Sequence, residues 1–393
     1  MKVLITGVDG YLGWPLALHL AKKGHEVAGI DNYLRRKLVG EMGSQSAIPI
    51  QKMDVRLKAF HDHAGKNLRF FKGDLTDYSF VRNVYQAFRP ECIVFLGQIP
   101  SAPYSMLDVH HAAFTQQNNV IGNLITLYAM KEVVPDCHLL KLGTMGEYGT
   151  PNVDIPEGFF ELEFRGRKDQ AIFPRKAGSW YHLSKVHDTH NVEFACRIWG
   201  MRATDIMQGV VYGSCIDAME NDPLLSTRFD FDQCFGTAIN RFCAQAVIDE
   251  PITPFGKGHQ KRGFLPLRDS IQCLTLAIEN PPAGGEYRVF NQFEEVYNIY
   301  QLAEMVQSVA STFDLNVKIK SIQNPRIEAE EHHYKPDHEH LLRLGYKPTH
   351  DMKSELNTVF KDLIPHRDRI ESRKEAFIPD IRWDGTRKTS KEL

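Results

Sequence analysis

Short apolar runs alternate with longer segments of helical periodicity through the first half of the chain. The runs are residues 2–6, 26–30, 68–71, 92–96, 138–142 and 202–207. Helical patterns fill the intervals, for example after Gly13, from Tyr78 to Phe88 and from about Ala112 to Val133. Short apolar runs separated by helices are typical of βαβ units. We therefore predict an α/β fold with a Rossmann-like, doubly wound parallel sheet.

The pattern changes after about residue 213, where polar connections lengthen and prolines and glycines become more frequent. We predict that residues 1–213 form the sheet domain, with a basic and polar insertion at about residues 32–67. Residues 214–393 should mainly form a smaller lobe over the carboxyl edge of the sheet, from which the chain could return to the sheet.

Composition argues against several kinds of partner. The formal net charge of the 393 residues is -2, so a nucleic acid or a membrane surface is not expected as the main partner. No apolar run is long enough for a transmembrane helix, and the first strand begins at Lys2, so we expect no signal peptide. The seven cysteines are scattered without a Cys-x-x-Cys pair, which favours reduced thiols in a cytoplasm.

A glycine-rich turn follows the first predicted strand. Gly7, Gly10 and Gly13 are spaced for a tight turn, close approach of a pyrophosphate and close helix–strand packing, with the helix N-terminus facing the phosphates. Asp31 ends the second strand, where a carboxylate binds the adenosine ribose and disfavours a 2′-phosphate. The turn predicts NAD rather than NADP, a preference that three following basic residues weaken: Arg35, Arg36 and Lys37.

Tyr181 and Lys185 lie four residues apart in a predicted helix, so they share one of its faces. A phenol is a poor base at neutral pH because its pKa is about 10, and a neighbouring ammonium lowers that pKa. The pair could therefore take a proton from a sugar hydroxyl while a cofactor accepts the hydride. Thr144, at the end of the strand 138–142, could bond the same hydroxyl.

Together these residues resemble the extended short-chain dehydrogenases/reductases that act on nucleotide sugars. Five longer segments are similar to one family among them, the UDP-sulfoquinovose synthases: residues 143–152, 180–188, 208–213, 235–243 and 324–332. The resemblance runs from Met1 to about residue 360, and the first two segments are far more specific than the glycine turn.

The resemblance implies that UDP-glucose and sulfite are converted to UDP-sulfoquinovose with NAD as a tightly held cofactor, in a homodimer. Tyr181 would take the C4 hydroxyl proton, helped by Lys185 and Thr144, and His182 is our candidate acid/base for the elimination of water. The expected cofactor contacts are Gly7, Gly10, Tyr11, Leu12, Gly13, Asp31, Asn32, Arg35, Asp74, Leu75, Gly97, Asn118, Tyr181, Lys185, Gln208 and Val211. The expected substrate contacts are Gln98, Ser101, Thr144, Tyr181, Gln208, Thr237, Gln260, Arg262 and Arg326, with Arg268 a further candidate for the diphosphate.

The sequence departs from related enzymes at two places. Ordinary dehydratases carry an Asp-Glu pair after the threonine, where this chain has Met145 and Gly146; Glu147 and Tyr148 are nearby alternatives to His182. Ile99 stands where plant members of the family carry arginine, so another cation would have to serve sulfite or the sugar.

Three other interpretations stay open. One is a UDP-hexose 4-epimerase or 4,6-dehydratase, which would share the tyrosine, lysine and threonine. Another is a non-catalytic NAD- or RNA-binding relative, although such proteins typically lose the tyrosine or the lysine. The third is a metal site among Glu330, Glu331, His332, His333, His338 and His340; their spacing matches no standard zinc pattern, and we expect no metal.

Overall fold

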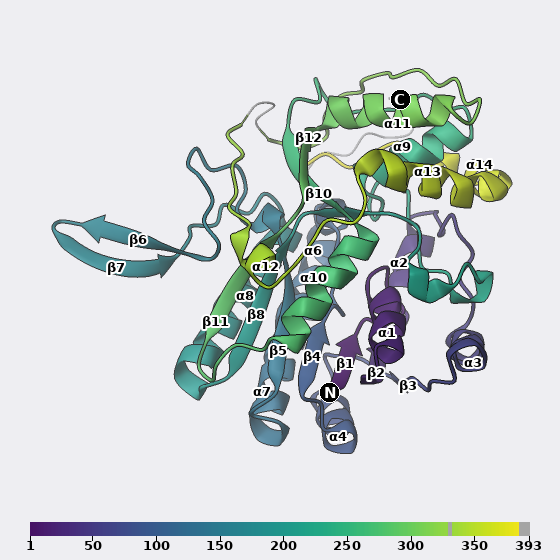
Figure 1. The fold of residues 1–393 in the computed structure, drawn as a ribbon. Helices are drawn as coiled ribbons and strands as arrows, with labels where there is room; N and C mark the ends of the chain where they lie inside the picture. Colours follow the sequence, from purple (N-terminus) through teal and green to yellow (C-terminus); the bar gives the residue numbers. More distant parts are fainter. Residues whose placement is uncertain (329–331, 385–393) are drawn as a thin grey trace.

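A parallel sheet forms the centre of the computed structural model, which describes residues 1–328 and 332–384 (Figure 1). Its seven strands have the order β11-β8-β5-β4-β1-β2-β3. In that order they are β11 (Tyr287–Gln292), β8 (Arg202–Gln208), β5 (His138–Thr144), β4 (Cys92–Phe95), β1 (Lys2–Thr6), β2 (Glu26–Asp31) and β3 (Arg69–Lys72). The predicted doubly wound fold is confirmed, and the strand order reverses between β1 and β4, where ligands bind in such sheets.

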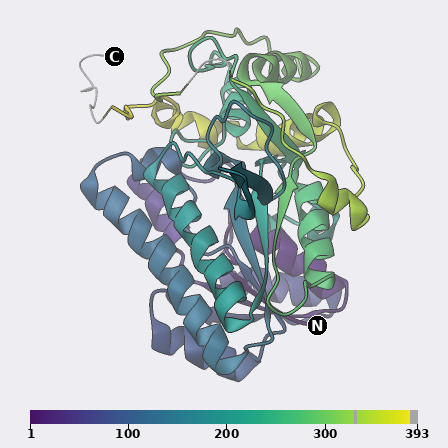
Figure 2. The ribbon, with the colours of Figure 1, turned by 90° about the vertical axis from the view of Figure 1, so that its left-hand side faces the viewer.

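Helices cover both faces of the sheet because its strands are apolar on both sides. Along β1, Val3 and Ile5 pack towards α1 (Gly13–Lys22) and α10 (Leu267–Glu279), whereas Leu4 packs towards the opposite face. That face carries α4 (Tyr78–Phe88), α7 (Gly122–Val133) and α8 (Trp180–Trp199), of which α7 and α8 lie side by side in Figure 2. No helix among the described residues is long and apolar enough to cross a membrane.

The segment 32–67 contains two helices, α2 (Leu34–Glu41) and α3 (Met53–Ala64). The buried Arg56 of α3 donates to Asp9 in the glycine turn at 2.8 Å, and its guanidinium stacks on Trp14 at 4.0 Å. Arg36 of α2 also donates to both carboxylate oxygens of Asp9, at 2.6 and 2.7 Å. These pairs tie the insertion to the glycine turn.

The chain after residue 213 builds a lobe above the carboxyl ends of the strands and also re-enters the sheet through β11 (Figure 1). A second sheet, β12-β10-β9, contains β12 (Glu295–Asn298), β10 (Lys261–Pro266) and β9 (Val210–Tyr212). The helices of the lobe are α9 (Ala238–Val247), α11 (Ile299–Ser311), α13 (Met352–Leu363) and α14 (Arg367–Glu371), whereas α12 (Glu339–Arg343) packs against β11 and α10. A separate hairpin, β6 (Phe159–Phe164) and β7 (Arg167–Ile172), projects away from the body.

Two short helices and a π-turn connect β4 to α7. They are α5 (Ala102–Ser105), α6 (Val109–Gln116) and the π-turn at Gln117–Ile121. Asn119 of this turn accepts from the backbone N–H of Ile99 at 2.8 Å and donates to the Ser184 hydroxyl at 2.9 Å. The π-turn therefore joins the end of β4 to α8.

A cluster of buried charges joins β5, β8 and α8. Lys141 of β5 donates to Asp205 of β8 at 2.9 Å and lies 3.5 Å from Glu147. Glu147 in turn accepts from Arg175 at 2.6 Å, and the Thr189 hydroxyl of α8 contacts both carboxylates. Burial lowers the pKa of Lys141, but Asp205 and Glu147 outweigh it and raise that pKa above its ordinary value. The cluster is held together by opposite charges in the absence of solvent.

Replacing Lys141 by methionine should lower the free energy of unfolding by about 3–5 kcal/mol, because it leaves Asp205 and Glu147 buried with one cation fewer. Urea unfolding followed by circular dichroism measures the change. Lys168→Met, on the exposed hairpin, is the matched control and should leave the midpoint unchanged. Equal midpoints for Lys141→Met and the control would contradict the stabilising role of the cluster.

Candidate active site

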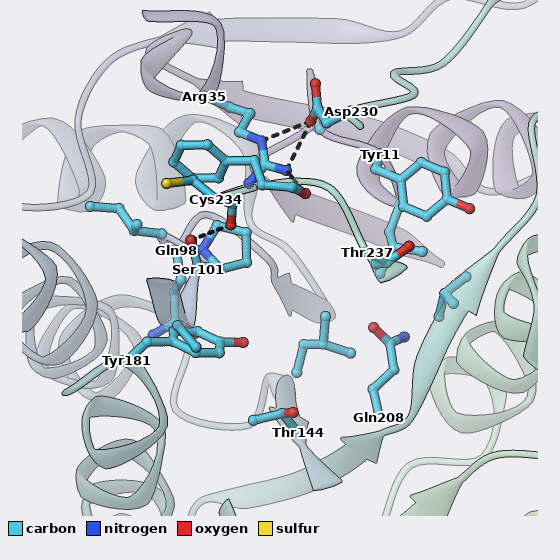
Figure 3. Close-up of a pocket in the computed structure, with 18 of the residues that line it drawn as sticks. Tyr11, Arg35, Gln98, Ser101, Thr144, Tyr181, Gln208, Asp230, Cys234 and Thr237 are labelled. Carbon is cyan, nitrogen blue, oxygen red and sulfur yellow. Dashed lines mark hydrogen bonds and ion pairs between the residues drawn. The ribbon is translucent and has the colours of Figure 1, made fainter. Parts of the chain in front are cut away.

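A cavity of about 460 Å³ opens at the carboxyl edge of the sheet and is closed from above by the lobe. It is lined by all the residues for which cofactor, substrate or catalytic roles were expected, from Gly7 in β1's turn to Arg326 in the lobe, apart from Arg268. Figure 3 shows Tyr181, Thr144 and Gln208 around one part of this cavity and Arg35 and Asp230 around another.

The glycine turn lines the end of the cavity next to β1. A Cβ at Gly13 would lie 2.3 Å from the carbonyl oxygen of Gly7, and Gly7 itself has a φ of +72°, so neither position accepts a side chain without strain. No side chain caps the N-terminus of α1, and its first turn contains no acidic residue. These features fit a dinucleotide pyrophosphate, which would accept hydrogen bonds from the free backbone N–H groups.

Asp31 occupies the position expected for a ribose ligand. Its carboxylate accepts from the backbone N–H groups of Asp9 at 2.9 Å and Tyr33 at 2.6 Å, which fixes its orientation. Burial, and then the neighbouring Asp9, raise the pKa of Asp31 to about 6. Asn32 donates to Asp74 at 3.0 Å, so the ends of β2 and β3 are joined at the same place.

The basic residues after Asp31 each have an acidic partner. Arg35 donates to Asp230 at 2.8 and 3.0 Å and stacks on Phe235, Arg36 binds Asp9, and Lys37 lies 3.7 Å from Glu41. A 2′-phosphate would have to compete with these carboxylates. The arrangement therefore favours NAD more clearly than the basic sequence suggested.

Tyr181 and Lys185 project from the first turns of α8, which Ser179 caps by accepting from the backbone N–H of His182. The Lys185 ammonium lies 5.9 Å from the centre of the Tyr181 ring and donates to Gln98 and to the Leu142 carbonyl, the latter at 2.7 Å. Burial, and then Lys141, lower the pKa of Lys185 to about 8, so it stays mostly protonated at neutral pH.

The pKa of Tyr181 is raised, which contradicts the expectation that Lys185 lowers it. Burial, and then Glu147, raise the pKa of Tyr181 above its ordinary value, and the charge of Arg35 opposes this shift. The physical reason is that desolvation of the phenolate outweighs the attraction of an ammonium that is directed to Gln98 and Leu142. In the protein alone the phenol is therefore protonated.

The His182 imidazole occupies the space next to Gly146, two residues after Thr144, where a side chain is absent. A Cβ at Gly146 would lie 2.3 Å from Nε2 of His182, so only glycine fits beside this imidazole. Nδ1 of His182 lies 3.0 Å from the Ser179 hydroxyl, and the ring is 5.0 Å from that of Tyr181. Burial, and then Arg326 and Arg262, lower the pKa of His182 to about 3, which leaves the imidazole neutral.

The two alternatives to His182 are engaged elsewhere. Glu147 is fully buried in the Lys141 cluster and also accepts from the backbone N–H of Thr144 at 3.2 Å. Tyr148 is fully buried and its hydroxyl donates to Asn291 at 2.9 Å. Neither lines the cavity, because the turn after β5 directs both side chains into the core.

The lobe contributes polar and aromatic groups to the cavity. Arg262 donates to Glu328, and Arg326 lies over Trp383 with its guanidinium 5.2 Å from the ring centre. Gln260 donates to the Phe255 carbonyl at 3.3 Å, and Thr237 caps α9. The candidate Arg268 is wrong, because it pairs with Glu355 at 2.9 Å and with Asp217 at 3.1 Å away from the cavity.

Arg241 also lines the cavity, although the sequence did not single it out as a ligand. It stacks on Phe255 at 4.1 Å and donates to the Thr253 carbonyl at 2.8 Å. Burial, and then Arg326, lower its pKa to about 9. Its position one turn after Thr237, at the start of a helix, was the available signal. Arg326, whose charge contributes to this shift, lines the same cavity. Two arginines on one cavity wall suit an anionic ligand.

Gln98 and Ser101 line the cavity with their polar groups already engaged. The Gln98 amide accepts from Lys185 and donates to Asp188, and the Ser101 hydroxyl donates to the Cys234 carbonyl. Gln208 donates to Gln292 at 2.9 Å and to Ser270 at 3.1 Å. Ile99 is buried against the cavity without a charge, as the sequence implied.

The histidines proposed as metal ligands are dispersed. His333 pairs with Asp154 at 2.7 Å, and His340 lies 3.0 Å from the Val289 carbonyl. Glu330 and Glu331 lie outside the described residues. Within residues 1–328 and 332–384, no group of three or more metal-ligating side chains is suitably placed for an ion.

Solved structures similar to this one share its fold. UDP-glucose 4-epimerase from Thermotoga maritima superposes with a TM-score of 0.67 at 18% identity, covering 92% of this chain and 98% of that one. UDP-glucuronic acid 4-epimerase from Bacillus cereus, solved with UDP-glucuronic acid and NAD, gives 0.68 at 18% identity, covering 92% and 99%.

Sequence comparisons give a closer relation. The model of the NAD dependent epimerase/dehydratase family matches residues 3–292. UDP-sulfoquinovose synthase of Sulfolobus acidocaldarius is 47% identical over 384 residues, which covers 98% of both chains. The chloroplastic UDP-sulfoquinovose synthase of Spinacia oleracea is 46% identical over 382 residues, covering 97% of this chain and 79% of that one. The chain therefore belongs to the NAD-dependent epimerase/dehydratase family and, within it, to the UDP-sulfoquinovose synthases.

Proposed function

We propose that this chain converts UDP-glucose and sulfite to UDP-sulfoquinovose and water, with NAD as a resident cofactor. The observation that carries the proposal is the near full-length identity to two UDP-sulfoquinovose synthases. The glycine turn and Asp31 supply one end of the cavity, and Tyr181, Thr144 and His182 supply the other. The arginines of the lobe would bind the diphosphate of the sugar nucleotide.

The reaction would begin with oxidation at C4 of the glucose. Bound NAD would supply the hydride acceptor and return the same hydride to C4 at the end. The Thr144 hydroxyl orients the C4 hydroxyl, and Tyr181 takes its proton. The Lys185 ammonium, one helical turn away, would help to stabilise the phenolate that this step requires, against the burial that keeps the phenol protonated in the protein alone.

His182 would carry the proton through the elimination. The C4 ketone acidifies the C5–H bond, so a neutral imidazole can accept the C5 proton. The resulting imidazolium would protonate the C6 hydroxyl as it leaves as water, which returns His182 to the neutral form that its buried position favours. Sulfite, entering as hydrogen sulfite, would then form a bond from its sulfur to C6 of the enone, and its proton would go to C5. Ile99 offers sulfite no charge, so the available cations are those that line the cavity: Arg35, Lys185, Arg241, Arg262 and Arg326.

The rival functions are disfavoured by particular residues. A 4,6-dehydratase would need carboxyl groups where Met145 and Gly146 stand, and Glu147 is directed into the core. A non-catalytic role does not require Thr144, Tyr181 and Lys185 to line the cavity together, as they do. A 4-epimerase would use the same three residues but gives His182 no proton to move.

Mass spectrometry of the product from UDP-glucose, with and without sulfite, tests the reaction. We expect a sulfite-dependent sulfonated sugar nucleotide, and Tyr181→Phe should lower its rate at least ~100-fold while leaving UDP-glucose affinity nearly unchanged. The matched control is Tyr78→Phe, which alters an exposed phenol outside the cavity. UDP-galactose as the product, or activity that survives in Tyr181→Phe, would refute the proposal.

Gly146→Ala tests the role of His182, because the new methyl group would displace the imidazole from its position. We expect sulfonated product to fall at least ~10-fold, while oxidation of UDP-glucose, followed by cofactor absorbance in a single turnover, is retained. Gly40→Ala, at a helical position with no atom within 4 Å of the added Cβ, is the control. Unchanged product formation by Gly146→Ala would exclude His182 from the elimination.

We also propose that the chain forms a homodimer through the outer face of α6, α7 and α8. Apolar side chains gather there on one side of the molecule: Phe114, Ile121, Tyr128, Phe194 and Ile198 are all exposed. Tyr128 of α7 and Phe194 of α8 lie 5.0 and 5.9 Å from the ring of Trp199, so apolar side chains of these two neighbouring helices meet there. Exposed apolar patches of this kind are typical of interfaces between proteins.

Ile198→Glu should convert the dimer to a monomer, because it would bury a carboxylate at the interface. Light scattering coupled to size exclusion measures the mass of each form. Leu342→Glu, on the exposed side of α12, should leave the dimer intact. A wild-type protein that is monomeric at micromolar concentration would show the proposal to be wrong.

A further inference from the structure

Asp188 is a buried carboxylate that the reaction described above does not use. It lies on α8 one turn after Lys185, and it is fully buried. Oδ2 accepts from Nε2 of Gln98, while Oδ1 has no hydrogen-bond partner among residues 1–328 and 332–384. A fully buried carboxylate is costly, so its position calls for a reason.

The Gln98 amide connects Asp188 to Lys185. Its Oε1 accepts from the Lys185 ammonium, and its Nε2 donates to Asp188 and, at 3.4 Å, to the Asn119 carbonyl. A carboxylate can only accept a hydrogen bond, so an ionised Asp188 forces the NH₂ end of the amide towards itself. The oxygen end is then left to face Lys185. Reversal of the amide would point NH₂ at an ammonium and lose both bonds.

We propose that Asp188 is a positioning residue, whose carboxylate orients the Gln98 amide so that it holds the Lys185 ammonium in place for Tyr181. The inference rests on the proposed function, because it concerns the pair that acts at C4. Asp188 touches neither the cavity nor Tyr181's hydroxyl and acts only through Gln98 and through its charge.

The charges around Asp188 come from several elements. Lys185 shares its helix, Lys141 faces it from β5, Glu147 from the turn after β5, and Asp205 from β8. Burial raises the pKa of Asp188 to about 7, although Lys141 and Lys185 oppose the shift. For Lys185 the sign is the opposite, since burial and Lys141 lower its pKa while Asp188 raises it. Removing the charge of Asp188 should therefore make Lys185 lose its proton at lower pH.

Asp188→Asn is the informative variant, because asparagine keeps the size but removes the charge, and its amide can accept or donate and so no longer fixes the direction of the Gln98 amide. We expect kcat at pH 8 to fall about fivefold and the alkaline limb of the pH–kcat profile to move down by about one unit, with KM for UDP-glucose within about twofold of wild type. Glu193→Gln, on the same helix with its carboxylate paired to Arg197 at the surface, is the control.

Gln98→Leu provides the second variant, because it removes the bridge and leaves Asp188 intact. If Asp188 acts through Gln98, Asp188→Asn should cause a smaller loss in the Gln98→Leu background than in the wild type. Additive losses, or a wild-type pH profile in Asp188→Asn, would overturn the proposal. A loss that is equal at every pH would equally overturn it, because it would indicate a merely structural role.

A measurement without substrate follows the protonation of Asp188 itself. The pKa of Asp188 is raised in the folded protein, so between about pH 4 and pH 7 the unfolded chain loses this proton first and the wild type loses stability as pH rises. The midpoint of thermal unfolding of Asp188→Asn, relative to wild type, should rise from pH 5 to pH 8. A wild-type pH–kcat profile in Asp188→Asn, in protein that forms the sulfonated product, would sink the inference alone, whereas wild-type protein without sulfonated product would sink the proposed function alone.

Discussion

The buried charge cluster around Lys141 sets how β5, β8 and α8 meet. Lys141, Asp205 and Glu147 leave no room for these elements to shift, because each displacement would separate buried opposite charges. Thr144 ends β5 and Tyr181 lies in the first turn of α8, so the same cluster determines how these two proposed catalytic side chains face each other. Burying these charges costs desolvation free energy, but it fixes the ends of β5 and α8 that face the cavity. The proposed chemistry depends on that geometry.

Local patterns were enough to predict the sheet, the glycine turn and the Tyr181–Lys185 pair. Each depends on residues close together in the sequence, whose spacing reports a strand, a turn or one helix face. The carboxyl ends of neighbouring strands then bring Asp31, Asp74 and Thr144 to one edge, which is a property of every parallel sheet. For this reason the expected residues line one cavity.

The remaining features depend on partners far apart in the sequence. The turn that directs Glu147 into the core is fixed by Arg175 and Lys141, and the sequence alone does not reveal that pairing. Desolvation is equally non-local: it raises the pKa of Tyr181 against the expectation from Lys185, and lowers that of His182. The pairing of Arg36 with Asp9 is also non-local. The sequence alone predicted that this basic stretch would weaken the preference for NAD over NADP, whereas in the structure the charge of Arg36 is already paired.

The position of β11 at the edge of the main sheet has a consequence for how the chain is made. β8 pairs with β5 on one side and with β11 on the other, yet β9, α9, β10 and α10 separate β11 from β8 in the sequence. During synthesis, the backbone N–H and C=O groups on this edge of β8 therefore stay unpaired until the segment through Gln292 has left the ribosome. An open edge of this kind can pair with another nascent chain. The risk of aggregation is therefore higher during this interval of translation than in the finished protein.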